Sequence, residues 1–304
     1  MSSGLRVGIG AALLAVVLSG CTSSPVHGSG TRVSSSGSSV VAAPSPPSQT
    51  RSATPSRTPT RTTSRPAIVP ATPTGAPPTL PRFPAGSGPL VVLNPGHNGG
   101  NATHLAEINR QVPAGFGQYK ACDTTGTNTV SGYSEHAFNW DVTLRVRAAL
   151  QARGVRVVLT RPNDTGVGPC VDQRAAIGNA TGVAAVISIH SDGTASGAGR
   201  GFHVCEASRP PAGATIAARS HSLSVAIHDA LVRSSGLVPS TYIGTNGYYP
   251  RSDLAGLNLA VRPATFLELG NMRNAADAAL LTSPAGRERI AEAVAAGILG
   301  YLGR

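Results

Sequence analysis

Four short polar segments of this 304-residue chain carry side chains that could bind a metal ion or move a proton. His97 follows one apolar run, His190 closes another, Glu268 interrupts a third, and Glu135 begins an amphipathic stretch. Two imidazoles and one carboxylate are the ligand set of a catalytic zinc ion that keeps its fourth position for water. A second carboxylate would then serve as the general base. The four residues are far apart along the chain and form no short motif, so taken alone they favour zinc-dependent hydrolysis without establishing it.

Each of these residues also has an ordinary structural interpretation. His97 could be an ordinary loop histidine, although the glycines around it are typical of a backbone that approaches a ligand closely. Glu135 could merely complement the positive end of a helix. Glu268 is harder to explain in this way, because an unpaired carboxylate in an apolar strand is costly. A salt bridge from Glu268 to Arg262 or Arg273 is the structural alternative.

The elements that must position these residues begin at residue 88. Apolar runs predict buried strands over residues 89–94, 155–160, 183–189 and 264–269, and a weaker strand over 201–205. Two helices are predicted over residues 135–153 and 285–302, where apolar residues recur at helical spacing. Strands separated by helices indicate an α/β sheet that is covered on both faces. In such sheets ligand sites form at the carboxyl ends of strands, where His97 and His190 are expected.

The helix over residues 135–153 has a clear apolar face and recognisable ends. Ser134 is placed to cap its amino end, and Gly154 is placed to end it. Its apolar face consists of Phe138, Val142, Val146, Ala149 and Leu150.

The first 20 residues have the pattern of a secretory signal. Residues 8–18 form an apolar run after Arg6, and this run is too short to span a bilayer, which needs roughly 20 residues. It ends in Leu18-Ser19-Gly20-Cys21, which resembles the lipobox of bacterial lipoproteins. That resemblance implies removal of residues 1–20, acylation of Cys21, and a location on the outer face of the cytoplasmic membrane. The alternative is an ordinary secretory signal that is followed by a cysteine by chance.

Residues 21–87 are expected to be a disordered linker that starts at the lipidated cysteine. Ser, Thr, Pro, Gly and Arg dominate this segment, which therefore buries too little apolar surface to offset its ordering entropy. As a coil it would reach roughly 45 Å, and as extended polyproline II about 200 Å. The formal charge of the chain is +11. Before Gly88 the only residues counted in that charge are arginines, and there are no acidic residues. No aromatic residues are interleaved among these arginines, so we expect no nucleic-acid site. The alternatives are an anionic lipid or a wall polymer as electrostatic partner, or a linker that is merely solvated.

Four motifs in the remaining part, residues 88–304, occur in the order found in a known family. Residues 91–100 (VVLNPGHNGG), Glu135, residues 188–191 (SIHS) and residues 266–271 (FLELGN) resemble the zinc-dependent N-acetylmuramoyl-L-alanine amidases of the type 3 family. The resemblance implies that His97, Glu135 and His190 bind one Zn²⁺ and that Glu268 is the catalytic carboxylate. It also implies a single domain with a mixed, mostly parallel sheet flanked by helices.

Two positions depart from the family pattern. The family usually has Asp at the position of Asn94, and it lacks the additional Asn98. Both departures concern groups that would orient the ring of His97.

The activity that the resemblance implies is hydrolysis of the amide between the lactyl group of N-acetylmuramic acid and L-alanine of the stem peptide in peptidoglycan. A zinc peptidase that cuts within the stem peptide could use the same residues. A non-catalytic wall-binding lipoprotein would have no need of Glu268. We expect a monomer with peptidoglycan as its partner, and we identify Arg251 and His104 as candidates for contacting the substrate.

Three cysteines remain beyond Cys21. Secretion makes a disulfide the default. Cys122 and Cys170 both fall in loops near the expected site, whereas Cys205 falls in a strand. We therefore predict a Cys122–Cys170 disulfide and a buried Cys205 thiol.

Overall fold

A six-stranded sheet forms the centre of the computed structural model, which describes residues 81–304; the predicted signal sequence and Cys21 lie outside the described residues. The strand order is β4-β1-β5-β8-β6-β7. The strands are β1 (Leu90–Pro95), β4 (Arg156–Leu159), β5 (Val183–Asp192), β6 (His203–Ala207), β7 (Tyr248–Arg251) and β8 (Ala264–Asn271). Every neighbouring pair is parallel except β6 with β8. The sheet is therefore mixed and mostly parallel, as the family resemblance implied.

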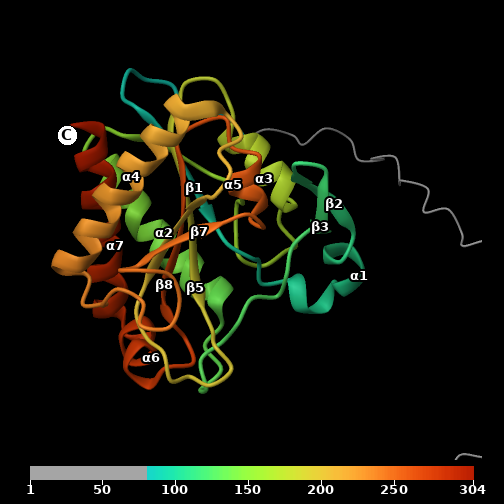
Figure 1. Ribbon diagram of the computed structural model, residues 1–304, viewed down its shortest axis with the longest axis vertical. Helices are drawn as coiled ribbons and strands as arrows, with labels where there is room; N and C mark the ends of the chain where they lie inside the picture. Colours follow the sequence, from blue (N-terminus) through green and yellow to red (C-terminus); the bar gives the residue numbers. More distant parts are fainter. Residues whose placement is uncertain (1–80) are drawn as a thin grey trace, which may run out of the picture. The chain divides into compact units, whose positions relative to one another are not determined.

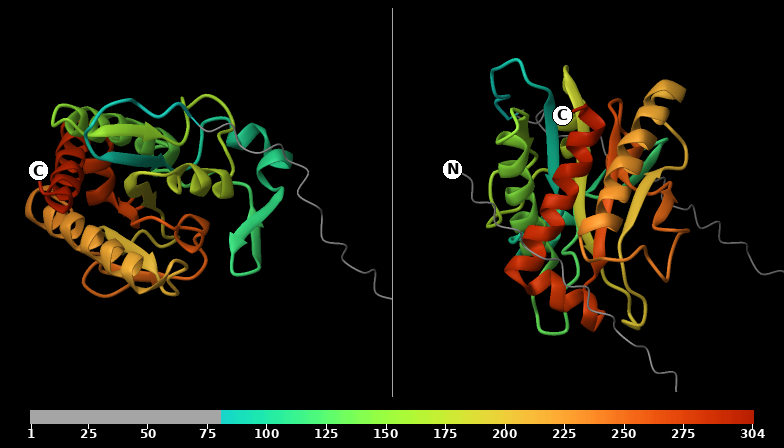
Figure 2. Two further views of the ribbon diagram at one scale, coloured as in Figure 1. Left: turned by 90° about the horizontal axis from the view of Figure 1, so that it is seen from above. Right: turned by 90° about the vertical axis from the view of Figure 1, so that its left-hand side faces the viewer.

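Helices cover both faces of the sheet (Figure 1). One face carries α2 (Glu135–Gln151), α4 (Gly213–Ser234) and α7 (Pro284–Leu302), and the other carries α3 (Val171–Gly178) and α5 (Ala255–Asn258). Figure 2 shows the sheet between these layers. The smaller elements are the 3₁₀-helix η1 (Asn101–Thr103), α1 (Leu105–Ile108), the hairpin strands β2 (Gln111–Gly115) and β3 (Gln118–Ala121), and α6 (Ala275–Thr282). The predicted α/β class, with a sheet covered on both faces, is confirmed.

The core lies on both sides of the sheet because successive strand residues point to opposite faces. In β5, Ile187 and Ile189 join the larger cluster beneath α2, α4 and α7, whereas Val186 joins the smaller cluster beneath α3 and α5. Phe266 of β8 lies on the second side as well. Ser188 and His190 alternate with the isoleucines and therefore face the same side as Val186 and Phe266.

The predicted helix over residues 135–153 is confirmed, but its predicted cap is wrong in one respect. Phe138 and the other large apolar residues of its predicted face are buried. Ser134 occupies the N-cap position, yet its side chain makes no capping hydrogen bond. Instead the Glu135 amide donates to the Thr127 carbonyl oxygen at 2.9 Å, because the preceding loop folds back over the helix end. Gly154 follows the helix with a φ of +71°, in the left-handed region that glycine tolerates.

Several elements were not indicated by the sequence patterns, among them α4 and the hairpin of β2 and β3. Helix α4 has 22 residues, but its large buried apolar residues are only Leu223, Ile227 and Leu231, spaced among serines and other polar residues. The hairpin of β2 and β3 contains Pro113, and a proline argues against a strand unless that strand lies at an edge. Among residues 81–304 no helix is both long enough and apolar enough to cross a membrane.

The predicted disulfide is present. Cys122 and Cys170 are bonded, with Cα atoms 4.4 Å apart and a sequence separation of 48. Chain-entropy reasoning gives such a closed loop a stabilisation of about 4 kcal/mol. Within the described residues Cys205 has no disulfide partner and is buried, as predicted.

A candidate metal centre beside β1 and β5

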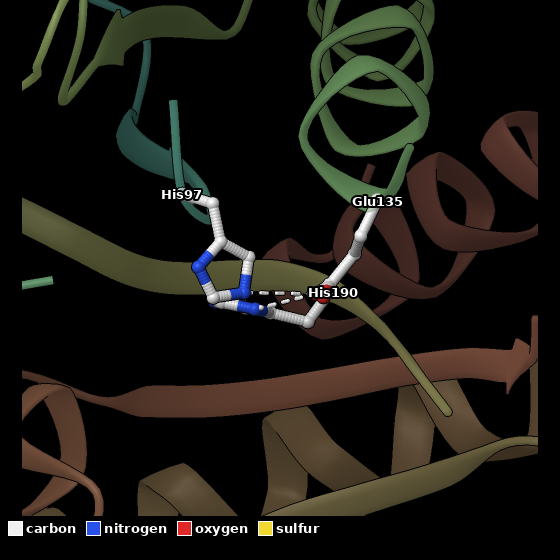
Figure 3. Close-up of side chains that lie close together, drawn as sticks. All are labelled: His97, Glu135 and His190. Carbon is white, nitrogen blue, oxygen red and sulfur yellow. Dashed lines mark hydrogen bonds and ion pairs between the residues drawn. The ribbon is translucent and has the colours of Figure 1, made fainter. Parts of the chain in front are cut away.

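Three residues from different parts of the chain converge at the carboxyl ends of β1 and β5. His97 follows β1, Glu135 is the first residue of α2, and His190 lies in β5. Oε1 of Glu135 lies 3.1 Å from Nε2 of His97 and 3.0 Å from Nδ1 of His190. Figure 3 shows both imidazole rings beside this carboxylate. One ligand atom from each of the three residues lies within 4.8 Å of the others, so the set can hold a metal ion.

Close backbone approach makes this convergence possible. His97 adopts a φ of +56°, an uncommon conformation for a residue other than glycine. At the preceding Gly96, an added Cβ would lie 2.0 Å from Cε1 of His190. Gly126, in the loop before α2, also lies close to the site: an added Cβ there would lie 2.8 Å from Oε2 of Glu135. The glycines predicted to permit a close backbone approach around His97 therefore do so at Gly96, against the ring of His190.

We expect Gly96→Ala to weaken metal binding, because the new methyl group would push the His190 ring out of place. Comparable changes around metal ligands alter affinity by about 10- to 100-fold. Competition between the variant protein and a chelator for Zn²⁺ measures the effect. Gly166→Ala is the matched control, since an added Cβ at Gly166 meets no atom within 4 Å. Equal zinc affinity in both variants would show that Gly96 is not needed for the position of His190.

In the metal-free protein the site already holds a positive charge between carboxylates. Burial alone lowers the pKa of His97, but Glu135 and Asp123 outweigh it and raise the pKa to about 10. Burial raises the pKa of Glu135, yet His97 and His190 hold it well below its usual value. Burial and the charge of His97 lower the pKa of His190. A divalent cation would take the place of the His97 proton, as metal binding to histidine requires.

The ring of His97 is oriented by the loop that precedes α2. Its Nδ1 lies 2.9 Å from the carbonyl oxygen of Thr124. A carbonyl only accepts hydrogen bonds, so Nδ1 carries a hydrogen, and Nε2, which faces Glu135, is the nitrogen that would bind a metal after losing its proton. The two positions that depart from the family pattern are not involved in this contact. Asn94 bonds to Ser188 and Thr160, and Asn98 accepts from the amide of Gly99.

Glu268 lies next to the three candidate ligands. In the β5–β8 ladder it is the register partner of His190, and its Oε2 is buried without a hydrogen-bond partner. Burial, reinforced by Glu135 and Asp192, raises the pKa of Glu268 well above its usual value. Neither of the salt bridges considered from the sequence, to Arg262 or Arg273, is formed. Glu268 therefore offers a carboxyl group that no structural role occupies.

A cavity of about 350 Å³ opens onto these four residues. It is also lined by residues that the sequence analysis missed, among them Lys120, Asp192, residues 123–127 and residues 254–256. Asp192 accepts a hydrogen bond from the Tyr242 hydroxyl at 2.9 Å. Its position two residues after His190 was a signal available in the sequence, whereas Lys120 lies on the hairpin that the patterns did not indicate.

The two substrate candidates named from the sequence lie outside the lining of this cavity. Arg251 pairs with Asp253 at 2.6 Å and lies over the ring of Tyr249. His104 lies at the start of α1, where its Nδ1 is 2.8 Å from the Gly100 carbonyl oxygen. A substrate role for Arg251 or His104 stays a prediction.

Comparisons with known proteins agree on one family. The family model described as N-acetylmuramoyl-L-alanine amidase matches residues 91–300. N-acetylmuramoyl-L-alanine amidase Rv3717 of Mycobacterium tuberculosis is 49% identical over 216 residues, which cover 71% of this chain and 87% of that protein. The crystal structure of the N-acetylmuramyl-L-alanine amidase Ami1 from Mycobacterium smegmatis is 50% identical with a TM-score of 0.67, over 71% of this chain and 98% of that one. Apo Ami1 from Mycobacterium abscessus is 49% identical with the same TM-score, over 71% and 99%.

Proposed function

Since this chain belongs to the N-acetylmuramoyl-L-alanine amidase family, we propose that it hydrolyses the amide between the lactyl group of N-acetylmuramic acid and L-alanine with the help of one zinc ion. The observation that carries the zinc proposal is the convergence of His97, Glu135 and His190 beside the unpartnered carboxyl group of Glu268. Two imidazoles and one carboxylate fit a catalytic zinc site, because they leave one coordination position for water or substrate.

In this proposal each residue has a separate task. The chemistry that zinc supplies when bound is Lewis acidity, which lowers the pKa of water toward about 7 and polarises a carbonyl group. His97, Glu135 and His190 hold the ion. Glu268 takes a proton from the attacking water and then donates it to the departing amine of L-alanine, acting first as base and then as acid. Its raised pKa suits a group that must hold a proton between these two steps.

Mass spectrometry of the products from purified peptidoglycan tests this function. An amidase releases stem peptides that begin with L-alanine and leaves the lactyl carboxyl group free on the glycan. A peptidase would instead leave at least L-alanine attached to the lactyl group. A wall-binding protein without activity would release nothing, and either of these results would overturn the proposal.

We further propose that the chain is a lipoprotein attached through Cys21 to the outer face of the cytoplasmic membrane, with residues 21–87 as its tether. The support is the lipobox-like sequence after the apolar run. Cys21→Ala should leave the precursor unprocessed or release the protein from the membrane fraction, as fractionation and intact mass would show. Cys205→Ala serves as the control and should stay with the membranes. A wild-type protein that is soluble and carries no acyl mass would rule out the anchor.

A further inference from the structure

The segment from Cys122 to Thr127, here called the ligand loop, contacts two of the three candidate metal ligands. The Thr124 carbonyl oxygen and Oδ1 of Asp123 lie 2.9 Å and 3.3 Å from Nδ1 of His97. At the other end of the loop, the Thr127 amide donates to Oε2 of Glu135 at 2.9 Å. The ligand loop therefore determines how the His97 ring and the Glu135 carboxylate are turned.

The ligand loop is itself fixed to α3 at its first two residues. At its first residue, Cys122 is joined covalently to Cys170, the residue at the N-cap of α3. One turn into that helix, Nη2 of Arg174 lies 2.9 Å from Oδ2 of Asp123. Both members of this ion pair are buried. The loop is a short segment without regular structure, so its position depends on these attachments and on the hydrogen bonds from the Cys122 and Asp123 amides to the Arg110 and Ile108 carbonyl oxygens.

Arg174 also connects the loop to the backbone on both sides of Gly96. Its Nη1 donates to the Pro95 carbonyl oxygen at 2.7 Å, and its Nη2 donates to the His97 carbonyl oxygen at 3.1 Å. One guanidinium group thus ties together the end of β1, the main chain of His97 and the Asp123 carboxylate. His97 is in the left-handed region, so its backbone depends on such contacts to stay in place.

We propose that the Cys122–Cys170 disulfide and Asp123 are positioning groups for His97, and that they set the affinity of the metal site. This inference rests on the proposed zinc site and goes beyond it, because it assigns the affinity to residues that do not touch the metal. The disulfide holds the first residue of the ligand loop against α3. Asp123 carries the connection from Arg174 to the His97 ring, which is the arrangement by which carboxylates orient metal-binding histidines in other zinc sites.

The test is the zinc affinity of the folded full-length chain at neutral pH, measured by competition with a chromogenic chelator. Asp123→Ala and the double variant Cys122→Ala/Cys170→Ala should each weaken zinc binding by about 10- to 100-fold. The triple variant should lose less than the product of the two effects, because both changes release the same loop. Matched controls are Asp141→Ala, which removes a partly exposed carboxylate on α2, and Cys205→Ala, which removes the buried thiol. Both controls should bind zinc as the wild type does.

A second readout separates a positioning role from general destabilisation. With Co²⁺ in place of Zn²⁺, the visible absorption spectrum reports ligand geometry, and it should change in Asp123→Ala but not in Asp141→Ala. Asp123→Asn keeps an oxygen near His97 and should recover part of the affinity. Zinc affinity within threefold of wild type in a folded Asp123→Ala variant would overturn the inference even if the cysteine variant failed to fold. A wild-type protein that binds no zinc would overturn both this inference and the proposed site, whereas unchanged variants of a zinc-binding wild type would overturn this inference alone.

Discussion

Glu268→Gln is expected to abolish most of the turnover while leaving the zinc in place. Glutamine keeps the volume of the side chain but cannot accept the proton of the attacking water. General acid–base catalysis contributes about 10²- to 10⁴-fold, or roughly 3 to 5 kcal/mol of barrier, and the loss should fall in that range. The metal should stay because the three residues that converge on the site are His97, Glu135 and His190.

The same variant should fold at least as well as the wild type. In the metal-free protein the pKa of Glu268 is raised above its usual 4.5, so ionising the buried carboxyl group disfavours the folded state as pH rises beyond about 4.5. Glutamine removes this penalty, and the melting temperature at pH 7 should hold or rise.

Three measurements on one preparation decide the role of Glu268: release of stem peptides, zinc content and melting temperature. Glu206→Gln on the neighbouring strand β6 is the matched control, because Glu206 pairs with the exposed His221 and lies outside the cavity. Near-normal turnover in Glu268→Gln would mean that another group is the base. Loss of zinc instead would make Glu268 a ligand and reopen the role given to Glu135.

The second large effect is expected from the histidines. His97→Ala and His190→Ala should each remove most of the zinc and with it the activity, since each removes one of the three proposed protein ligands. Chelation should inactivate the wild type, and added Zn²⁺ should restore it. His221→Ala is the control and should keep its metal. Full zinc content in both His97→Ala and His190→Ala would exclude them as ligands.

The metal-free protein adds a pH test of the same residue. The pKa of His97 is raised from 6.5 to about 10, so its proton stabilises the folded state fully below pH 6.5, and this contribution is lost as pH rises through about 10. Thermal melts of the metal-free wild type between pH 7 and pH 10 should show that loss. In His97→Ala the same window should be flatter, and an unchanged slope would argue against a shifted His97.

The sequence predicts best the strands that are buried on both faces of the sheet. In β1 a continuous apolar run (LVVL) is typical of a parallel strand that is covered on both faces, and the strand forms where the run lies. Helix α4 was not indicated because only three large apolar residues form its buried stripe, so its helical period is weak. Its position is fixed instead by packing against α7 and the sheet. Such contacts between distant segments leave no pattern in the local sequence.

The sequence and the family resemblance named the candidate ligands, but not the residues that support them. His97, Glu135, His190 and Glu268 each stand at the end of an element or inside a strand, where sequence patterns place them. Asp123 has no such signal, because its contact with His97 exists only after the loop has folded back over α2 and has been bonded to α3. Support residues of this kind are defined by tertiary structure.

The β5–β8 ladder has a consequence for how the protein would fail on heating. His190 and Glu268 are register partners on adjacent central strands, so the spacing between strands, about 4.8 Å, fixes how far the backbone of the proposed base lies from that of the candidate ligand. Central strands of a sheet open only when the whole domain unfolds. On the His97 side, the disulfide and the buried ion pair between Arg174 and Asp123 tie the ligand loop to the same domain. Both sides of the site would therefore come apart together, and loss of the metal and unfolding of the domain would be one thermal event.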